Sequence, residues 1–173
     1  MSSYSKNIQK GRSMIEMLGV LAIVGVLSAG GIAGYSMAMQ SYKTTALMDN
    51  VQIMMQATRM VFKNQSDYAG VSTYNLIQAG KISVNDIRNP FGGNLNIGAS
   101  GGMFFIDTQA NIPAEACVDI LMTNWGREGV LLGLNVVDVA EYRLHDGTYP
   151  ISDVSTAVSS CKGGNKKMRW WFK

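Results

Sequence analysis

The sequence contains little proline, cysteine and histidine, with three, two and one of each in 173 residues. Two cysteines and the single His145 leave no set of zinc ligands, and no Cys-x-x-Cys pair occurs. The glycine pairs lack the Gly-Lys-Ser/Thr ending of a phosphate loop, and we expect no nucleophile elbow. We therefore expect a protein that is not an enzyme and that holds no cofactor and no metal.

What the sequence does contain is one long apolar run, from Met14 to Met39, in which Glu16 is the only charged residue. As a helix, these 26 residues extend about 39 Å, which is enough to cross the ~30 Å hydrocarbon core of a bilayer. A carboxylate in such a segment costs a few kcal/mol unless it finds a partner. The run predicts a membrane helix that requires a positive charge beside Glu16.

The residues before this run indicate which end of the helix stays in the cytoplasm. Lys6, Lys10 and Arg12 are positive and no acid accompanies them, so the positive-inside rule keeps the N-terminus in the cytoplasm. A secretory signal peptide would have its small-residue cleavage site after the apolar run, and nothing after Met39 fits one. We expect the C-terminal part of the chain to cross the membrane while the apolar helix is retained.

A short polar leader ending in Gly11, a carboxylate at the fifth residue after it and an apolar helix together resemble a type IV prepilin. The resemblance implies cleavage between Gly11 and Arg12 by a prepilin peptidase. It also implies that Glu16 pairs with the free N-terminal amine of a neighbouring subunit during assembly, helped by an assembly ATPase and an inner-membrane platform protein. Three later segments, namely 89–93, 104–106 and 112–117, and a late second cysteine, Cys161, resemble the type IVb branch in particular.

The sequence departs from this family in two places. Arg12 stands where the first mature residue is usually apolar and N-methylated, so methylation is left open. The apolar run lacks the proline that family members often have in its second half, and its glycines supply a similar local weakness. Gly30 and Gly34 are spaced so that two helices can approach closely, which fits packing in a filament core and generic dimerisation equally.

Both cysteines lie in the part of the chain that should cross the membrane, where disulfides persist. A bond between Cys117 and Cys161 would stabilise the fold by about 4 kcal/mol in the chain-entropy model. In type IVb pilins the equivalent bond delimits a C-terminal region with an exposed surface, which here would be residues 117–161.

The C-terminus is basic, and two interpretations of its charge stay open. Residues 154–173 contain no acid, whereas residues 12–153 sum to −4. The basic residues are Lys162, Lys166, Lys167, Arg169 and Lys173. They form either a solvated tail or a surface that complements an acidic patch of another subunit.

The aromatic residues beside these cations also have two interpretations. Nucleic acid would be a partner if the rings of Trp170, Trp171 and Phe172 stacked on bases. We favour a last β-strand whose rings pack under the long helix, because aromatic residues are ordinary sheet material.

The predicted fold is α+β, with a long N-terminal helix packed on an antiparallel sheet. Residues 1–11 form the leader, 12–39 the hydrophobic helix, 40–64 its amphipathic continuation and 65–173 a globular head. Within the head we expect helices at 73–79, 114–124 and 154–160, with Pro113 in the first turn of the second. We expect strands at 94–97, 103–107, 130–139 and 168–172, with a bulge at Gly133.

The sequence therefore favours a structural subunit that starts as an inner-membrane precursor and forms a homo-oligomeric filament on the bacterial surface. Adhesion, aggregation, motility and DNA transfer are all compatible with such a filament. Two alternatives share parts of the pattern. One is a pseudopilin of a type II secretion system, and the other is a membrane-anchored DNA-binding module.

Overall fold

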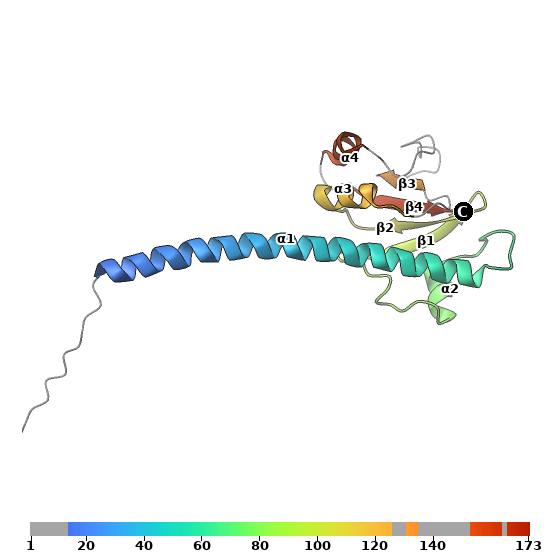
Figure 1. Cartoon of the computed structure of the whole chain (residues 1–173). Coiled ribbons are helices and arrows are strands. Elements are labelled where there is room, and N and C mark those ends of the chain that lie inside the picture. Colours follow the sequence, from blue (N-terminus) through green and yellow to red (C-terminus); the bar gives the residue numbers. More distant parts are fainter. Residues whose placement is uncertain (1–13, 126–130, 135–152, 164–165) are drawn as a thin grey trace, which may run out of the picture. The chain divides into compact units, whose positions relative to one another are not determined.

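The computed structural model describes residues 14–125, 131–134, 153–163 and 166–173 (Figure 1). The chain divides into two compact units, Met1–Met39 and Gln40–Lys173. Helix α1 (Met14–Val61) begins in the first unit and ends in the second. The single long helix that the sequence predicts is therefore present, although it ends at Val61 and not at Asn64, which lies in the turn that follows.

The second unit is the α+β head, and its sheet is antiparallel. The strands are β1 (Leu95–Ser100), β2 (Met103–Thr108), β3 (Leu131–Leu134) and β4 (Met168–Phe172), in the spatial order β1-β2-β4-β3. The C-terminal strand thus lies between β2 and β3 (Figure 1). Three further helices complete the described part of the head: α2 (Thr73–Gln78), α3 (Ala114–Met122) and α4 (Val154–Cys161).

The core of the head lies between the sheet and the second half of α1. Leu47, Val51, Met54 and Thr58 recur at helical spacing and are completely buried. They belong to the same cluster as the inward-facing residues of the sheet, which are Leu95, Ile97, Phe104, Ile106, Met168, Trp170 and Phe172. The Thr58 hydroxyl donates to the Met54 carbonyl at 2.8 Å, so this buried polar group is satisfied within its own helix. Residues 40–61 therefore form an amphipathic helix whose apolar stripe packs against the sheet in the core.

The β1–β2 hairpin is closed by two glycines in the left-handed region. Gly101 and Gly102 have φ of 60° and 76°, and Ser100 pairs with Met103 across them. A two-residue turn with both φ values positive is the type I′ turn that matches the twist of a hairpin. Residues 98–102 read Gly-Ala-Ser-Gly-Gly, which has the Gly-x-Ser-x-Gly spacing of a nucleophile elbow. Ser100, however, is the last residue of β1 at this hairpin. A nucleophile elbow requires a strand-to-helix turn, so Ser100 is not one.

The other face of the sheet carries an ion pair and two aromatic rings in contact. Arg169 donates to Asp107 at 2.6 Å, and its guanidinium lies 4.1 Å from the centre of the Phe105 ring. Phe105 also packs against Trp171, with ring centroids 4.8 Å apart. The Phe105 ring covers Gly98, where an added Cβ would come within 2.5 Å of it. A large ring and a missing side chain thus complement each other across the β1–β2 pair.

Two local predictions are wrong and one falls partly outside the described residues. Pro113 precedes α3 as its N-cap residue and is not in its first turn. Gly133 pairs directly with Arg169 in an unbroken register, so β3 has no bulge there. The expected strand at 130–139 is described at 131–134 only.

Candidate functional site

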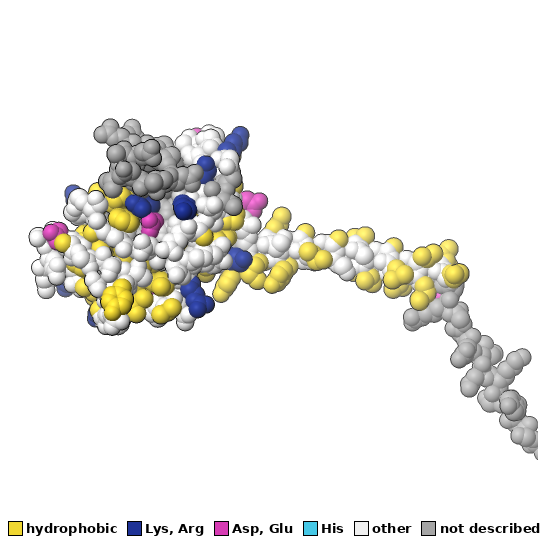
Figure 2. Space-filling view, turned by 180° about the vertical axis from the view of Figure 1, so that it is seen from behind, with side chains coloured by type: hydrophobic (Ala, Val, Ile, Leu, Met, Phe, Trp, Pro, Cys, Tyr) yellow, Lys and Arg dark blue, Asp and Glu magenta, His cyan; other side chains and the backbone are white. Residues whose placement is uncertain are grey.

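The apolar half of α1 is a candidate functional surface. Every residue from Met14 to Met39 is exposed, and the exposed fractions of Met14, Leu18 and Leu27 are 87%, 66% and 69%. Hydrophobic side chains occur along the whole segment (Figure 2). Among the described residues, α1 alone is long and apolar enough to cross a membrane. An apolar surface of this length requires cover from lipid or from other apolar helices.

Glu16 lies in the first turn of α1. The N-terminus of a helix carries a partial positive charge, which favours an acid at this position. Glu16 is also the only charged residue between Met14 and Met39, so its carboxylate marks one end of the apolar surface. Gly11 and Arg12, the residues of the expected cleavage site, lie outside the described residues.

Gly30 and Gly34 lie in the middle of the same surface. A Cβ built on either glycine would meet no atom within 4 Å, so neither glycine is needed for packing within the described chain. Since glycine destabilises a helix by roughly 1 kcal/mol relative to alanine, these positions weaken α1 without a compensating contact inside one subunit.

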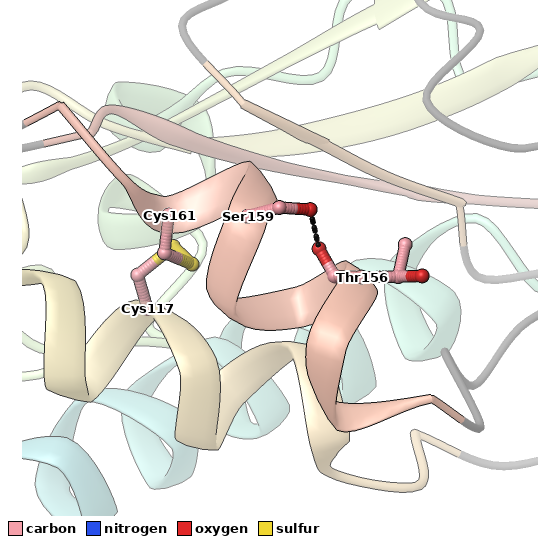
Figure 3. The surroundings of a disulfide bond; sticks show 4 residues. All are labelled: Cys117, Thr156, Ser159 and Cys161. Atoms are coloured by element: carbon pink, nitrogen blue, oxygen red, sulfur yellow. Dashed lines mark hydrogen bonds between the residues drawn. A yellow bond between two sulfur atoms is a disulfide. The ribbon is translucent and has the colours of Figure 1, made fainter.

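The disulfide joins α3 to α4, as Figure 3 shows. Cys117 and Cys161 are 44 residues apart in sequence, with Cα atoms 6.0 Å apart, and both are buried. The predicted bond between these two cysteines is therefore present. In α4, the Ser159 hydroxyl donates to the Thr156 carbonyl at 2.9 Å (Figure 3).

Asp153 caps the N-terminus of α4 and so helps to position Cys161. Its carboxylate accepts hydrogen bonds from the hydroxyls of Ser155 and Thr156 at 2.6 and 2.7 Å, and from the backbone N–H groups of both residues at 3.1 Å. These bonds, led by that from the Ser155 side chain, lower the pKa of the Asp153 carboxyl to about 2. The cap is thus charged throughout the neutral and mildly acidic range.

The predicted basic residues have different environments. Lys162, Lys167 and Lys173 are exposed and Lys166 is half-buried. Arg169 is 16% exposed, and its charge is paired with Asp107 on the sheet. Arg169 therefore stabilises the sheet, whereas the four lysines present their charge at the surface.

The C-terminal aromatic rings belong to the interior of the head. Trp170 and Phe172 are completely buried and Trp171 is 3% exposed. The preferred prediction of a last strand packed under the helix is therefore confirmed, because Trp170 and Phe172 share one core cluster with α1. Stacking of these rings on nucleic acid bases is excluded in this fold, since the bases have no access to them.

One contact at the start of the head was not predicted. The Gln40 side-chain amide donates to Glu115 at 2.6 Å, so the first residue of the second unit is tied to α3. Neither residue belongs to a recognisable motif, and they are 75 positions apart in sequence. Among the described residues there is no group of three or more His, Cys, Asp and Glu that could hold a metal ion.

The family described as "PilS N terminal" matches residues 41–172, which is most of the chain. The chain belongs to the type IV pilin family. Relatives of this pilin include the major structural subunit of the bundle-forming pilus of Escherichia coli O127:H6, 28% identical over 142 residues, covering 76% of this chain and 74% of the relative. The toxin coregulated pilin of Vibrio cholerae serotype O1 is 28% identical over 96 residues, covering 51% of this chain and 43% of the relative.

Among solved structures, this pilin is similar to TcpA, a type IV pilin from Vibrio cholerae El Tor biotype. The TM-score is 0.56 at 14% identity, covering 76% of this chain and 99% of the other. At this identity the similarity establishes the fold alone. The relatives are pilins, and they agree with the resemblance to the type IVb branch, which rests on residues 89–93, 104–106 and 112–117.

Proposed function

We propose that this pilin is the structural subunit of a type IVb pilus. The precursor spans the inner membrane through residues 12–39, and prepilin peptidase cleaves it between Gly11 and Arg12 in the cytoplasm. The mature chain then polymerises through α1 into an extracellular filament. The observation that carries this proposal is the fully exposed apolar half of α1 with one carboxylate in its first turn.

The apolar half of α1 requires two successive environments. Before assembly, lipid covers it, since about 39 Å of helix matches the thickness of a bilayer. In the filament, the same surface is covered by the α1 helices of other subunits, and Gly30 and Gly34 permit close approach of the backbones. Movement from one apolar environment to the other exposes little of this surface to water.

Glu16 gives the assembly step its direction and register. In an apolar surrounding its carboxylate costs a few kcal/mol unless a cation is near. Cleavage after Gly11 creates such a cation, the amine of Arg12, on every subunit. We propose that Glu16 of one subunit pairs with this amine of its neighbour, and that an assembly ATPase and a platform protein in the inner membrane supply the work.

The division of the chain follows from this sequence of events. The leader is residues 1–11, residues 12–39 form the membrane and filament-core helix, and residues 40–64 extend it into the head of residues 65–173. The surface within the disulfide-bounded region 117–161 is exposed on the fibre. Adhesion, aggregation, motility or DNA transfer would depend on this surface.

Electron microscopy of sheared surface material tests the role of Glu16. With Glu16→Val we expect loss of filaments, because the neighbour's amine no longer meets a carboxylate. Glu16→Asp is the matched control, since it keeps the charge, and filaments should persist at reduced or normal yield. Filaments at wild-type yield from Glu16→Val or Glu16→Gln would contradict the proposed pairing.

Mass spectrometry of the mature protein tests the processing step. The mature N-terminus should be Arg12, and its mass also shows whether Arg12 is methylated. A mature chain beginning at any other residue, or an uncut precursor that polymerises as readily as the processed chain, would contradict the proposed mechanism.

A further inference from the structure

Four lysines lie close in the fold or the chain to the point where the apolar half of α1 ends. Lys43 follows Gln40 within one turn of α1, and Lys162, Lys166 and Lys167 follow the end of α4. We call these four residues the basal lysines. The sequence separates the first from the other three by more than a hundred residues, so only the folded head shows their relation.

Two hydrogen-bonded contacts and the disulfide connect the C-terminal lysines to Gln40. Gln40 is bonded to Glu115 in the first turn of α3 at 2.6 Å. Ile112, three residues earlier, exchanges backbone hydrogen bonds of 2.8 and 3.1 Å with Lys166. Three residues of chain span at most about 10 Å, so the backbone of Lys166 is near that of Glu115.

The second connection brings Lys162 to the same end of α3. Lys162 directly follows Cys161, which is bonded to Cys117 with Cα atoms 6.0 Å apart. Cys117 is two residues from Glu115, the residue that holds Gln40. Lys162 is exposed and Lys166 is half-buried, and within the described residues neither forms an ion pair. Glu115 and Asp119 are the acidic residues of α3.

Gln40 itself lies at the level of a membrane surface if residues 14–39 span the bilayer. Residues 14–39 occupy about 39 Å as a helix, whereas a bilayer with its headgroups is roughly 40–45 Å thick. If Glu16 lies at the cytoplasmic side, Gln40 lies among the headgroups of the opposite leaflet. This holds whatever the angle between the two units, because it depends only on the chain passing from Met39 to Gln40.

We propose that, in the membrane precursor, the basal lysines bind anionic phospholipid headgroups and hold the head against the bilayer. The proposal rests on the proposed function, since it requires residues 12–39 to span the membrane. Electrostatic attraction between a lysine and a headgroup extends over a Debye length of about 8–10 Å, so a lysine side chain near Gln40 can be attracted to the headgroups. One lysine near an anionic surface contributes about 1 kcal/mol, or about fivefold in the equilibrium between bound and released heads.

The test measures the acetylation rate of individual lysines by mass spectrometry on the full chain. The chain is reconstituted in vesicles of phosphatidylcholine alone, or with about 30 mol% phosphatidylglycerol to supply the anionic surface. Acetic anhydride is used because it is neutral and is not repelled by the vesicles. Lys63 and Lys81 are the internal controls, because both are exposed and Lys63 lies beyond the end of α1, more than about 30 Å along the helix from Gln40.

Phosphatidylglycerol should slow acetylation of Lys162 and Lys166 by about fivefold or more and leave Lys63 and Lys81 unchanged. Salt at about 0.5 M should abolish the difference, because the Debye length shortens. In Lys162→Glu/Lys166→Glu, protection of Lys43 and Lys167 should fall, whereas Lys63→Glu/Lys81→Glu, with the same change of charge, should behave as wild type.

Equal acetylation rates in the two kinds of vesicle, or equal slowing at Lys63, would overturn the proposal. So would a Lys162→Glu/Lys166→Glu chain that loses filaments while its lysines never respond to phosphatidylglycerol, since the basal lysines would then contact another subunit. A chain that alkaline carbonate removes from the vesicles would refute membrane insertion itself. A chain that stays inserted and shows no lipid dependence would refute only the lipid contact.

Discussion

Removing the disulfide should destabilise the head substantially without preventing the apolar helix from forming. The variant Cys117→Ala/Cys161→Ala deletes the one covalent link between α3 and α4. Both helices contribute to the core cluster of the head, so their separation exposes apolar surface there. The apolar half of α1 belongs to the other unit, and its helix does not depend on this bond.

The magnitude follows from the length of the loop that the bond closes. For a separation of 44 residues, the chain-entropy model gives about 4 kcal/mol. Cys117 and Cys161 are 0% and 1% exposed, so truncation to alanine adds a small cavity that costs about 1 kcal/mol. A total of about 5 kcal/mol would lower the Tm of a head of this size by roughly 15–20 °C.

The measurement is thermal unfolding of the full chain in detergent micelles, followed by near-ultraviolet circular dichroism. The tryptophans Trp125, Trp170 and Trp171 are at most 9% exposed and all lie in the head, so the tryptophan bands of the signal report the head alone. Wild type under strong reductant is the matched control, because it has lost the bond but keeps both cysteine side chains. It should be more stable than the double variant by only about 1 kcal/mol, which is the cost of the cavity. If the double variant were less stable than oxidised wild type by under about 1 kcal/mol, the reasoning would be refuted.

Three further substitutions probe the head, each measured by the same unfolding signal. Gly98→Ala should cost about 1–3 kcal/mol, because its Cβ would lie within 2.5 Å of the Phe105 ring. Arg169→Lys should cost about 1 kcal/mol, since lysine keeps the charge beside Asp107 but loses the planar stacking on Phe105. Asp153→Ala should destabilise the head at neutral pH. Because the pKa of Asp153 is lowered to about 2, this cost is complete above its unfolded pKa and disappears as the pH falls through about 2.

Each of these results has an outcome that would contradict it. If the ring causes the clash, Gly98→Ala should cost nothing further in a Phe105→Ala background, so full additivity would contradict the account. Equal stability of wild type and Arg169→Lys would show that the stacking contributes nothing. A cost of Asp153→Ala that is constant from neutral pH to about pH 2 would show that the carboxylate charge is not what caps α4.

The helices and strands of the described head were largely predictable, because their signals are local. Ser72 before α2 and Asp153 before α4 are N-cap residues, and both side chains accept the expected backbone hydrogen bonds. The burial of Leu95 and Ile97 and the exposure of Asn96 in β1 follow the alternation of apolar and polar residues in its sequence. Pro113 was placed one position too far into α3, since a proline fits both the N-cap and the first turn.

Contacts between residues far apart in sequence were not predictable. The basic C-terminus was treated as one surface, yet Arg169 belongs to an ion pair with Asp107, 62 positions earlier. No feature of residues 166–173 distinguishes Arg169 from its lysine neighbours until β4 is placed beside β2. That placement depends on which buried faces fit together. Because the hydrophobic effect is not directional, the sequence alone does not show which strand packs beside which.

The sequence by itself determined the apolar helix, the lone carboxylate in its first turn and the order of the helices and strands. These depend on periodicity, side-chain chemistry and chain length, which act between near neighbours. Only the tertiary structure decided the strand order β1-β2-β4-β3, the burial of the C-terminal rings and the hydrogen bonds that join Gln40 to Glu115 and Lys166 to Ile112. These depend on packing between distant segments, where each position is favourable only because the rest of the core is already formed.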